Sequence, residues 1–338
     1  MEKVSPLHPP AFLITIDTEG DNLWSQPAEI TTKNARYLPR FQALCEKHGF
    51  RPTWLANYEM AECPEFVEFG RDVLARGTGE IGMHLHGWNS PPIRPLTEND
   101  SRHQPYLYEY PEPVMWEKIR AMTDLLEERF DRKMVSHRAG RWGLNATYAR
   151  LLVEAGYRVD CSVTPHISWQ EYSGDPRGAG GPDFTQFPEQ PYFLDLEHLD
   201  RPGDSPLLEV PLSVIPTPYT RLNGWLAHGS PLLQRTFGRF FPPHHWLVPR
   251  DRWANRRGMS AVLNRALQNA WPCVEFATHS SELMPGGSPF FPHEKSIERL
   301  YRWLESFFAL AAENFQGMTL EEFAVSFSGE TATKIVQP

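Results

Sequence analysis

Residues 11–21 read AFLITIDTEGD, an apolar run that stops abruptly at acidic residues. A short apolar run bounded by polar residues predicts a buried β-strand, here over residues 11–16. Side chains two residues apart on a strand point to the same side, so Asp17 and Glu19 face one site where the strand ends. Gly20 lets the chain turn away from that site. Paired carboxylates serve as a general base with a metal ligand, or as two ligands; the alternative is a polar strand end that only bonds its own loop.

Strand and helix patterns alternate along the rest of the chain. Apolar or alternating segments predict further strands at residues 52–57, 80–86, 134–138, 157–163, 207–214 and 273–279. Apolar spacings of three and four residues predict helices at residues 31–48, 64–76, 112–130, 145–155, 253–269 and 292–314. About seven β–α units of this kind imply a parallel sheet covered by helices.

The placement of the polar residues favours a closed barrel over an open sheet. They recur at the C-terminal ends of predicted strands from every part of the chain, which is the face where barrel enzymes carry out their chemistry. An open sheet would have one crevice, usually beside a Gly-rich phosphate loop, and the sequence has no such motif. We therefore expect one catalytic α/β barrel domain over residues 11–325, with irregular insertions at about 164–206 and 215–251.

The bulk composition fits a globular protein and argues against several partners. A hydrophobic fraction of 41% and a charged fraction of 22% allow a full core. The net charge is -9 and there is no Lys/Arg-rich run, so neither nucleic acid nor an anionic membrane surface is an expected partner. No apolar run reaches the ~20 residues of a membrane-spanning helix.

Two further features lead us to expect a cytoplasmic protein. Residues 1–10 are polar and Pro-rich, and they lack the basic start and the apolar core of a signal peptide. The cysteines are scattered, with no C-x-x-C pair, which indicates reduced side chains rather than a disulfide framework or a structural zinc site. These cysteines are Cys45, Cys63, Cys161 and Cys273.

Histidines end two of the predicted strands. His84 and His86 are two residues apart, so both imidazoles lie on one face of the strand at 80–86, an arrangement suited to zinc. His279 closes the strand at 273–279 and opens a Gly/Pro loop, where an imidazole can act as an acid–base catalyst. Each of these could instead be a structural histidine. Their shared position at strand ends favours the functional interpretation.

The segment SHRAGRWG, residues 136–143, follows another predicted strand. Arg138 lies where the strand meets its loop and is suited to hold a carboxylate through two hydrogen bonds. Arg141 and Trp142 are candidates for lining the site or for stacking on a sugar face. The alternative is a surface loop with solvated arginines.

Together these segments resemble the polysaccharide deacetylases, carbohydrate esterase family 4. Residues 15–20 stand in the place of the family's Thr-Phe-Asp-Asp-Gly, and residues 79–84 are similar to its Gly-His-Glu-Ile-Gly-Asn-His segment. Arg138 matches the family's arginine motif and His279 its late histidine. The His-x-His-x-Trp, Arg-Ala-Gly-Arg-Trp-Gly and His-Ser-Ser-Glu-Leu variants look like a branch found with bacterial surface-polysaccharide and O-antigen synthesis.

This resemblance implies a distorted (β/α)7 barrel and a hydrolase that removes an acetyl group from an N-acetylated sugar. It makes Asp17 the general base, Arg138 its orienting partner and His279 the general acid, with Asp160 as a residue that tunes the acid. It makes His84 a ligand of a divalent metal ion, for which zinc is the expected ion. The carbohydrate would belong to surface polysaccharide or lipopolysaccharide biosynthesis.

Two departures from the family pattern change the expected ligand set. Where the family has a second histidine four residues beyond the first, this chain has Trp88, so we expect His86 to replace it. Thr18 occupies the place of the family's second aspartate, so we expect Glu19, rather than Asp21, to bind the metal.

The same departures leave two other functions open. One is a non-catalytic sugar-binding barrel with a degenerate site, and the other is a metal-free hydrolase of another small amide, such as a cyclic imide or ureide. In the favoured interpretation Trp88, Arg141 and Trp142 bind an acetylated sugar or saccharide. Aromatic residues in the first insertion favour a sugar, unless they only pack a small core of their own.

Overall fold

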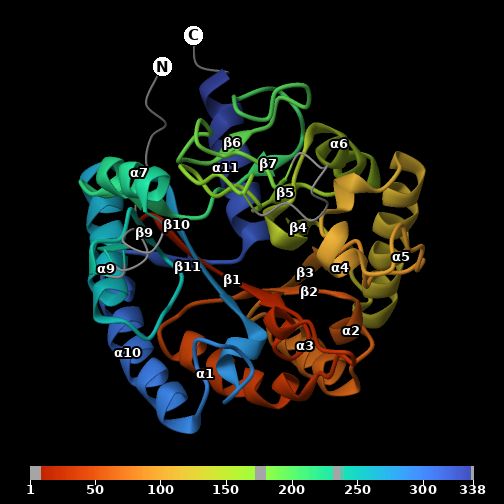
Figure 1. The fold of residues 1–338 in the computed structure, drawn as a ribbon, viewed down its shortest axis with the longest axis horizontal. Coiled ribbons are helices and arrows are strands. Elements are labelled where there is room, and N and C mark those ends of the chain that lie inside the picture. Colours follow the sequence, from red (N-terminus) through yellow and green to blue (C-terminus); the bar gives the residue numbers. More distant parts are fainter. Residues whose placement is uncertain (1–8, 172–179, 231–236, 239, 336–338) are drawn as a thin grey trace.

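The chain folds as a curled sheet surrounded by helices, seen along the shortest axis of the molecule in Figure 1. The computed structural model describes residues 9–171, 180–230, 237–238 and 240–335. The expectation drawn from residues 1–10 rests largely on residues 1–8, which lie outside the described residues. Short parts of both insertions also lie outside them, at 172–179, 231–236 and 239.

Seven parallel strands form the main sheet of the described chain, in the order β10-β1-β2-β3-β4-β5-β7. Their bounds are Ala11–Thr18 (β1), Thr53–Ala56 (β2), Glu80–Leu85 (β3), Ser136–Ala139 (β4), Val159–Asp160 (β5), Leu208–Glu209 (β7) and Cys273–His279 (β10). Each lies where the sequence predicts a strand. The expected (β/α)7 architecture is therefore confirmed. Two short strands extend the sheet: β6 (Tyr192–Phe193) runs antiparallel to β7, and β11 (Gln316–Met318) pairs with the first half of β1.

Helices cover the outside of the sheet (Figure 1). Those in the described chain are α1 (Leu38–Lys47), α2 (Tyr58–Ala61), α3 (Pro64–Arg76), α4 (Asp100–His103), α5 (Glu112–Phe130), α6 (Ala146–Ala155), α7 (Thr220–Gly229), α9 (Trp253–Gln268), α10 (Glu294–Ala312) and α11 (Leu320–Ile335). The helix predicted at 31–48 is wrong in its first part, which is the separate 3-10 turn η2 (Lys33–Tyr37). No helix in the described part of the chain has both the length and the apolarity needed to cross a bilayer.

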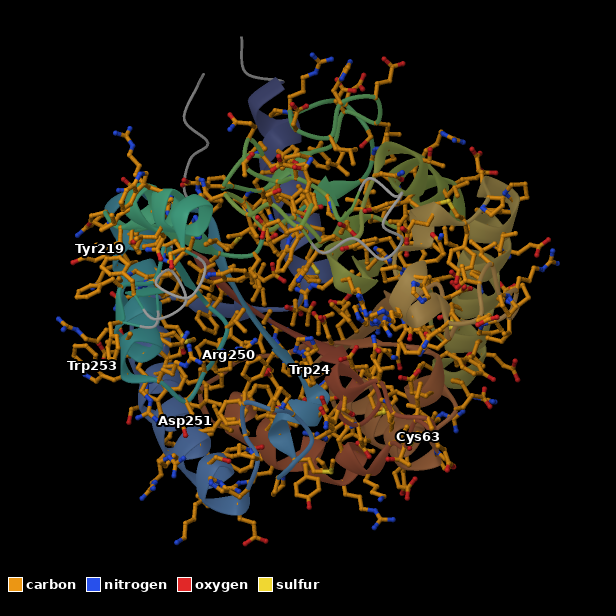
Figure 2. The ribbon with its side chains drawn as sticks, viewed as in Figure 1. Trp24, Cys63, Tyr219, Arg250, Asp251 and Trp253 are labelled. Atoms are coloured by element: carbon orange, nitrogen blue, oxygen red, sulfur yellow. The ribbon has the colours of Figure 1, made fainter. Side chains whose placement is uncertain are left out.

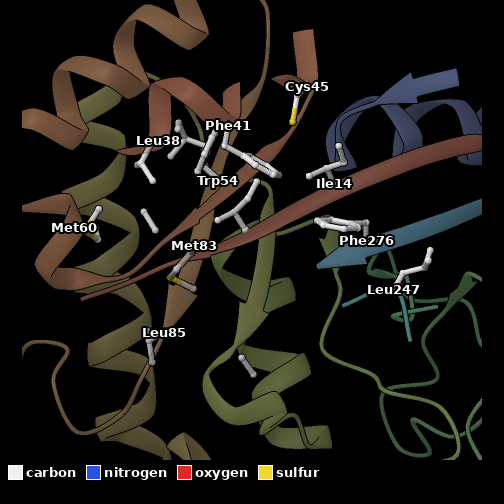
Figure 3. Packing of buried hydrophobic residues seen from close by; sticks show 14 of the residues in the cluster. Ile14, Leu38, Phe41, Cys45, Trp54, Met60, Met83, Leu85, Leu247 and Phe276 are labelled. Carbon is white, nitrogen blue, oxygen red and sulfur yellow. The ribbon is translucent and has the colours of Figure 1, made fainter. Parts of the chain in front are cut away.

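Strand periodicity places the apolar side chains of β1 in two different buried clusters. On β1, Phe12 and Ile14 point outward and pack with residues of the covering helices, such as Phe41 (Figure 3). The alternate residue Leu13 points into the barrel, where it joins a second cluster that includes Phe323 of α11. Side chains of the last helix therefore pack against apolar residues of the barrel interior, at the N-terminal part of the strands.

A buried carboxylate fixes this last helix in place. Glu80 Oε2, inside the barrel, accepts a hydrogen bond from the backbone N–H of Glu321 at 3.0 Å, and Thr53 Oγ1 accepts one from Leu320 N at 3.1 Å. Acidic groups stabilise helix N-termini because the first N–H groups of a helix have no partner within it. The N-terminus of α11 is thus bonded to β2 and β3.

The second insertion closes the barrel where the sheet itself stays open. Leu247 N donates to Ser213 O at 3.2 Å, and Leu247 O accepts from Ala277 N at 3.0 Å. This segment therefore lies between the chain that follows β7 and strand β10. It continues from a two-stranded sheet made by β8 (Val214–Pro216) and β9 (His244–Trp246), which stands beside the mouth of the barrel.

Candidate active site

Four of the expected site residues form two pairs of neighbours on adjacent strands. In the strand register Asp17 of β1 is opposite His279 of β10, and His84 of β3 is opposite Arg138 of β4. Parallel strands all end on the same face, so these side chains converge at the C-terminal mouth. A cavity of about 770 Å³ opens there.

The cavity gathers most of the residues that the sequence singles out. Its lining includes Asp17, Glu19, His84, His86, Trp88, Arg141, Trp142 and His279. Arg138 is absent from the lining because it is fully buried behind Asp17, to which it is bonded. All nine expected site residues thus lie at or directly behind one cavity.

Glu19, His84 and His86 bring three ligand atoms together, and we call them the metal trio. These atoms lie within 4.8 Å of one another, and all three residues are buried. The two Nε2 atoms are 3.1 Å apart, and Glu19 Oε2 lies 3.2 Å from that of His86 and 3.7 Å from that of His84. Two imidazole nitrogens and one carboxylate oxygen that face one point fit a divalent cation.

The surroundings of the trio support this fit. His84 Nδ1 lies 3.0 Å from the carbonyl oxygen of Arg138, and an N–H donated there leaves Nε2 free to bind a metal, as in most histidine ligands. Burial lowers the pKa of His86, which favours its neutral, ligating form. Burial acts in the same direction on His84, but Asp17 and Glu19 outweigh it and raise the pKa of His84. Although burial opposes it, the two imidazoles hold the pKa of Glu19 well below its usual value, so the carboxylate is ionised.

Asp17 is held by an arginine that is itself bonded at every nitrogen. Arg138 Nη1 donates to Asp17 Oδ1 at 2.5 Å, and its Nε donates to Cys161 O at 3.0 Å. Its Nη2 donates to Thr15 Oγ1 at 2.6 Å and to Glu275. Burial favours a neutral Asp17, but Arg138, His84 and His279 together outweigh burial, and the pKa of Asp17 is lowered. Glu275 behaves oppositely, because burial raises its pKa to about 7.

His279 faces carboxylates on both sides of its ring. Its Nε2 is 3.7 Å from Asp17 Oδ2, and its Nδ1 is 3.6 Å from Glu282 Oε2. Burial disfavours the imidazolium, but Glu282, Glu19 and Asp17 together raise the pKa of His279 to about 9. Arg250 Nη1, from the second insertion, donates to Glu282 Oε1 at 2.8 Å and helps to lower the pKa of Glu282 to about 2. The imidazole is therefore charged at neutral pH.

The hypothesis that Asp160 tunes this histidine is wrong. Asp160 Oδ1 lies 2.5 Å from Nδ1 of His137, whose Nε2 lies 2.8 Å from the hydroxyl of Tyr148 on α6. Asp160 therefore points outward, toward the helices. Glu282, three residues beyond His279, occupies the place beside the acid that the sequence interpretation gave to Asp160.

Tryptophans make up much of the cavity wall. Besides the expected Trp88 and Trp142, the lining includes Trp169, one of the aromatic residues of the first insertion that favour a sugar. It also includes Trp24 and Trp246, which the sequence interpretation did not assign to the site. The ring of Trp24 meets that of His279 edge-on, with centroids 4.8 Å apart. Figure 2 shows Trp24 and Arg250 toward the middle of the molecule. Flat aromatic faces beside charged groups suit a ligand with both apolar and polar faces.

Solved structures are similar to this chain, whereas no family model and no curated protein sequence matches it. A putative polysaccharide deacetylase from Mycobacterium smegmatis matches with a TM-score of 0.54 and 15% identity, over 97% of this chain and 96% of that one. Puue allantoinase matches with a TM-score of 0.49 and 13% identity, over 96% of this chain and 94% of that one. A family 4 carbohydrate esterase from Streptomyces lividans, in complex with acetate, matches 49% of this chain and 69% of its own with a TM-score of 0.33 and 13% identity.

Fold and site together define an α/β barrel with a buried group of side chains at its mouth that could hold a metal ion. The likeness to the Mycobacterium smegmatis structure shows, more particularly, that the barrel has the polysaccharide deacetylase fold. That is the fold which the sequence resemblance implies.

Proposed function

We propose that this protein is a metal-dependent deacetylase that removes an acetyl group from an N-acetylated sugar. The observation that carries the proposal is the metal trio, which lies in one cavity with an ionised carboxylate and a charged imidazole. Hydrolysis of an amide needs a base to deprotonate water and an acid to protonate the departing amine. Asp17 and His279 supply those two groups, 3.7 Å apart at their nearest charged atoms.

Different residues of the site have different roles in the proposed reaction. Glu19, His84 and His86 would hold the cation, whose chemistry when bound is that of a Lewis acid that polarises the acetyl carbonyl. Asp17, kept ionised by Arg138, accepts the proton of the attacking water. His279, with its pKa raised to about 9, donates a proton to the nitrogen of the leaving sugar. Zinc is the proposed ion because the trio offers two nitrogens and one oxygen.

Several observations support a saccharide as the substrate. The cavity wall carries five tryptophans, Trp24, Trp88, Trp142, Trp169 and Trp246, and indole faces stack well on pyranose rings. The sequence resemblance supports a sugar of bacterial surface polysaccharide or O-antigen synthesis.

All four cysteines are free and buried, which supports a reducing compartment and so the proposed cytoplasmic location.

The experiment that tests this proposal is an acetate-release assay on the zinc-loaded protein with a panel of N-acetylated saccharides, beside a panel of cyclic imides and ureides. We expect acetate from at least one saccharide and no opening of the cyclic amides. Turnover of a cyclic amide alone would favour another amide hydrolase. Saccharide binding without acetate release, in protein that carries the metal, would favour the non-catalytic barrel.

A further inference from the structure

Large apolar side chains are exposed together on the second insertion and at the start of α9. We call them the aromatic patch; its members are Tyr219, Leu222, Trp225, Phe240, Phe241 and Trp253. Trp225 is 71% exposed and Trp253 is 70% exposed. Figure 2 shows Tyr219 and Trp253 at the same edge of the molecule. Large apolar side chains exposed on one segment of a protein mark a place of interaction.

Hydrogen bonds hold the patch in shape. The buried side chain of Asn223, on α7, donates to the carbonyl oxygens of Tyr219 and Phe241, at 3.0 Å and 2.9 Å. The rings of Tyr219 and Phe241 lie against each other, with centroids 4.9 Å apart. Thr217 Oγ1 donates to Pro242 O at 2.7 Å and ties the start of α7 to the segment after it. The aromatic rings are therefore exposed while the backbone beneath them is satisfied.

The segment of the chain that carries the patch is rich in arginine. Residues 215–257 contain seven arginines and one aspartate, a net charge of +6, and since the whole chain carries -9 the remainder carries -15. The one aspartate, Asp251, is already paired, with Arg299 Nη2 at 2.5 Å and Arg256 Nη2 at 3.2 Å. The guanidinium of Arg257 stacks over the ring of Trp253 at 4.7 Å. Of the described arginines, Arg250 is paired with Glu282 and Arg256 with Asp251. The patch thus combines aromatic side chains with a segment whose net charge is positive.

We propose that the aromatic patch docks this protein on an anionic lipid bilayer. Tryptophan, tyrosine and phenylalanine partition to the headgroup boundary, where an apolar ring and polar surroundings are both satisfied. Arginines beside them are attracted by anionic headgroups. The rest of the chain, at -15, is repelled by such a surface, so the bilayer meets this face alone. The sequence argues against an anionic membrane surface through the net charge of the whole chain, and a net charge averages over segments of opposite charge.

Docking in this way would bring the cavity mouth to the bilayer. Gly238, Pro242 and His244, which belong to the same insertion as the patch, line the cavity. A saccharide displayed at the headgroups, or carried by a lipid, would then lie beside the opening. The docking itself is independent of the deacetylase reaction, since it needs no residue of the metal trio.

The test is co-sedimentation of the full-length protein with phosphatidylcholine vesicles, with and without phosphatidylglycerol. We expect binding to the vesicles with phosphatidylglycerol, weakened about tenfold in the variant Trp225→Ser/Trp253→Ser, because interfacial binding scales with the apolar area inserted. The matched control is Ile93→Ser/Val325→Ser, since these side chains are 59% and 71% exposed but lie outside the patch. The control should bind as the unchanged protein does, and equal melting temperatures will show that all three are folded.

A second pair of variants tests the charge. In the variant Arg221→Glu/Arg257→Glu, the affinity for phosphatidylglycerol vesicles should fall roughly fivefold or more for each arginine. In the control Arg158→Glu/Arg302→Glu, whose arginines lie elsewhere on the surface, the affinity should fall far less. No binding of the unchanged protein at low salt would overturn the proposal, and so would equal binding by the Trp225/Trp253 variant. A dimer in solution that this variant dissociates would also overturn it, in favour of a second copy of the chain.

Discussion

At the residue scale, the base and the acid of the site are each charged by a neighbour. Asp17 Oδ1 accepts from Arg138 at 2.5 Å, which favours the carboxylate, and Glu282 lies 3.6 Å from His279, which favours the imidazolium. Asp17 is buried and His279 is partly buried, so each neighbour favours the charged form against the cost of burial. The two proton-transfer groups therefore depend on residues that do not touch the substrate.

The substitution Asp17→Asn should remove the base and leave the metal trio intact. We expect acetate release to fall about 10²–10⁴-fold, the usual contribution of general acid–base catalysis. Metal content, measured on the same preparation, should equal that of the unchanged protein because Asp17 is not part of the trio. An active Asp17→Asn protein would show that another group takes the proton.

The substitution Glu282→Gln should move the pH dependence of the reaction. Glu282 helps to raise the pKa of His279 to about 9, so the acid stays protonated, and the enzyme active, up to that pH. Without this carboxylate the pKa of His279 falls, and activity should be lost about one pH unit lower. A pH profile of kcat measures the shift, and Glu282→Asp should restore part of it. An unchanged alkaline limb would rule out the proposed role of Glu282.

The raised pKa of His279 also bears on stability. A group whose pKa is higher in the folded state stabilises that state fully below its unfolded pKa, about 6.5 for histidine. This contribution is lost as the pH rises through about 9. Urea unfolding of the metal-free protein measures this effect. The free energy of unfolding should fall between pH 6 and pH 10, and it should fall further in the unchanged protein than in His279→Gln.

At the scale of elements, the turn after β4 sets how close the trio can come together. A Cβ built on Gly140 would lie 2.5 Å from His86 Nδ1, so only glycine lets the backbone pass this imidazole. The next two residues, Arg141 and Trp142, both have positive φ, 54° and 61°. Such strain in consecutive non-glycine residues is typical of functional sites. The backbone of this turn therefore packs directly against the imidazole of His86.

The substitution Gly140→Ala should therefore weaken metal binding. The added methyl must displace the imidazole of His86, and we expect affinity for zinc to fall about 10–100-fold, as when the support of a ligand is lost. Gly224→Ala is the matched control, because a Cβ there meets nothing within 4 Å. Competition with a zinc chelator measures both. Equal affinities would mean that His86 is not held as the structure shows.

The sequence predicts the strands better than the roles of the residues around them. Strand periodicity is local, which is why all seven parallel strands lie where expected. The same rule, applied to β5, would have corrected the role given to Asp160: Val159 and Cys161 both face the barrel interior, so the residue between them points outward. The sequence could have suggested Glu282 as a partner of His279, since it lies only three residues further on. Nothing in the local sequence, however, shows which carboxylate a turn directs at an imidazole.

At the scale of the whole molecule, the contacts that complete the barrel are distant in sequence. Leu247 closes the gap between β7 and β10, and Arg250, from the same insertion, reaches Glu282. The sequence shows the second insertion only as an irregular stretch, because its contacts depend on the fold that surrounds it. The +6 charge of residues 215–257 could be read from the sequence, but only the fold shows that exposed aromatic rings accompany it.

The central claim is that the metal trio binds a divalent cation, and the metal content of the purified protein tests it most directly. We predict close to one equivalent of zinc in the unchanged protein and almost none in His84→Ala/His86→Ala. The matched control is His244→Ala/His245→Ala, which alters two histidines of the same cavity that are outside the trio and should keep the metal. Absence of metal from the unchanged protein even after loading, or full occupancy in His84→Ala/His86→Ala, would contradict the account.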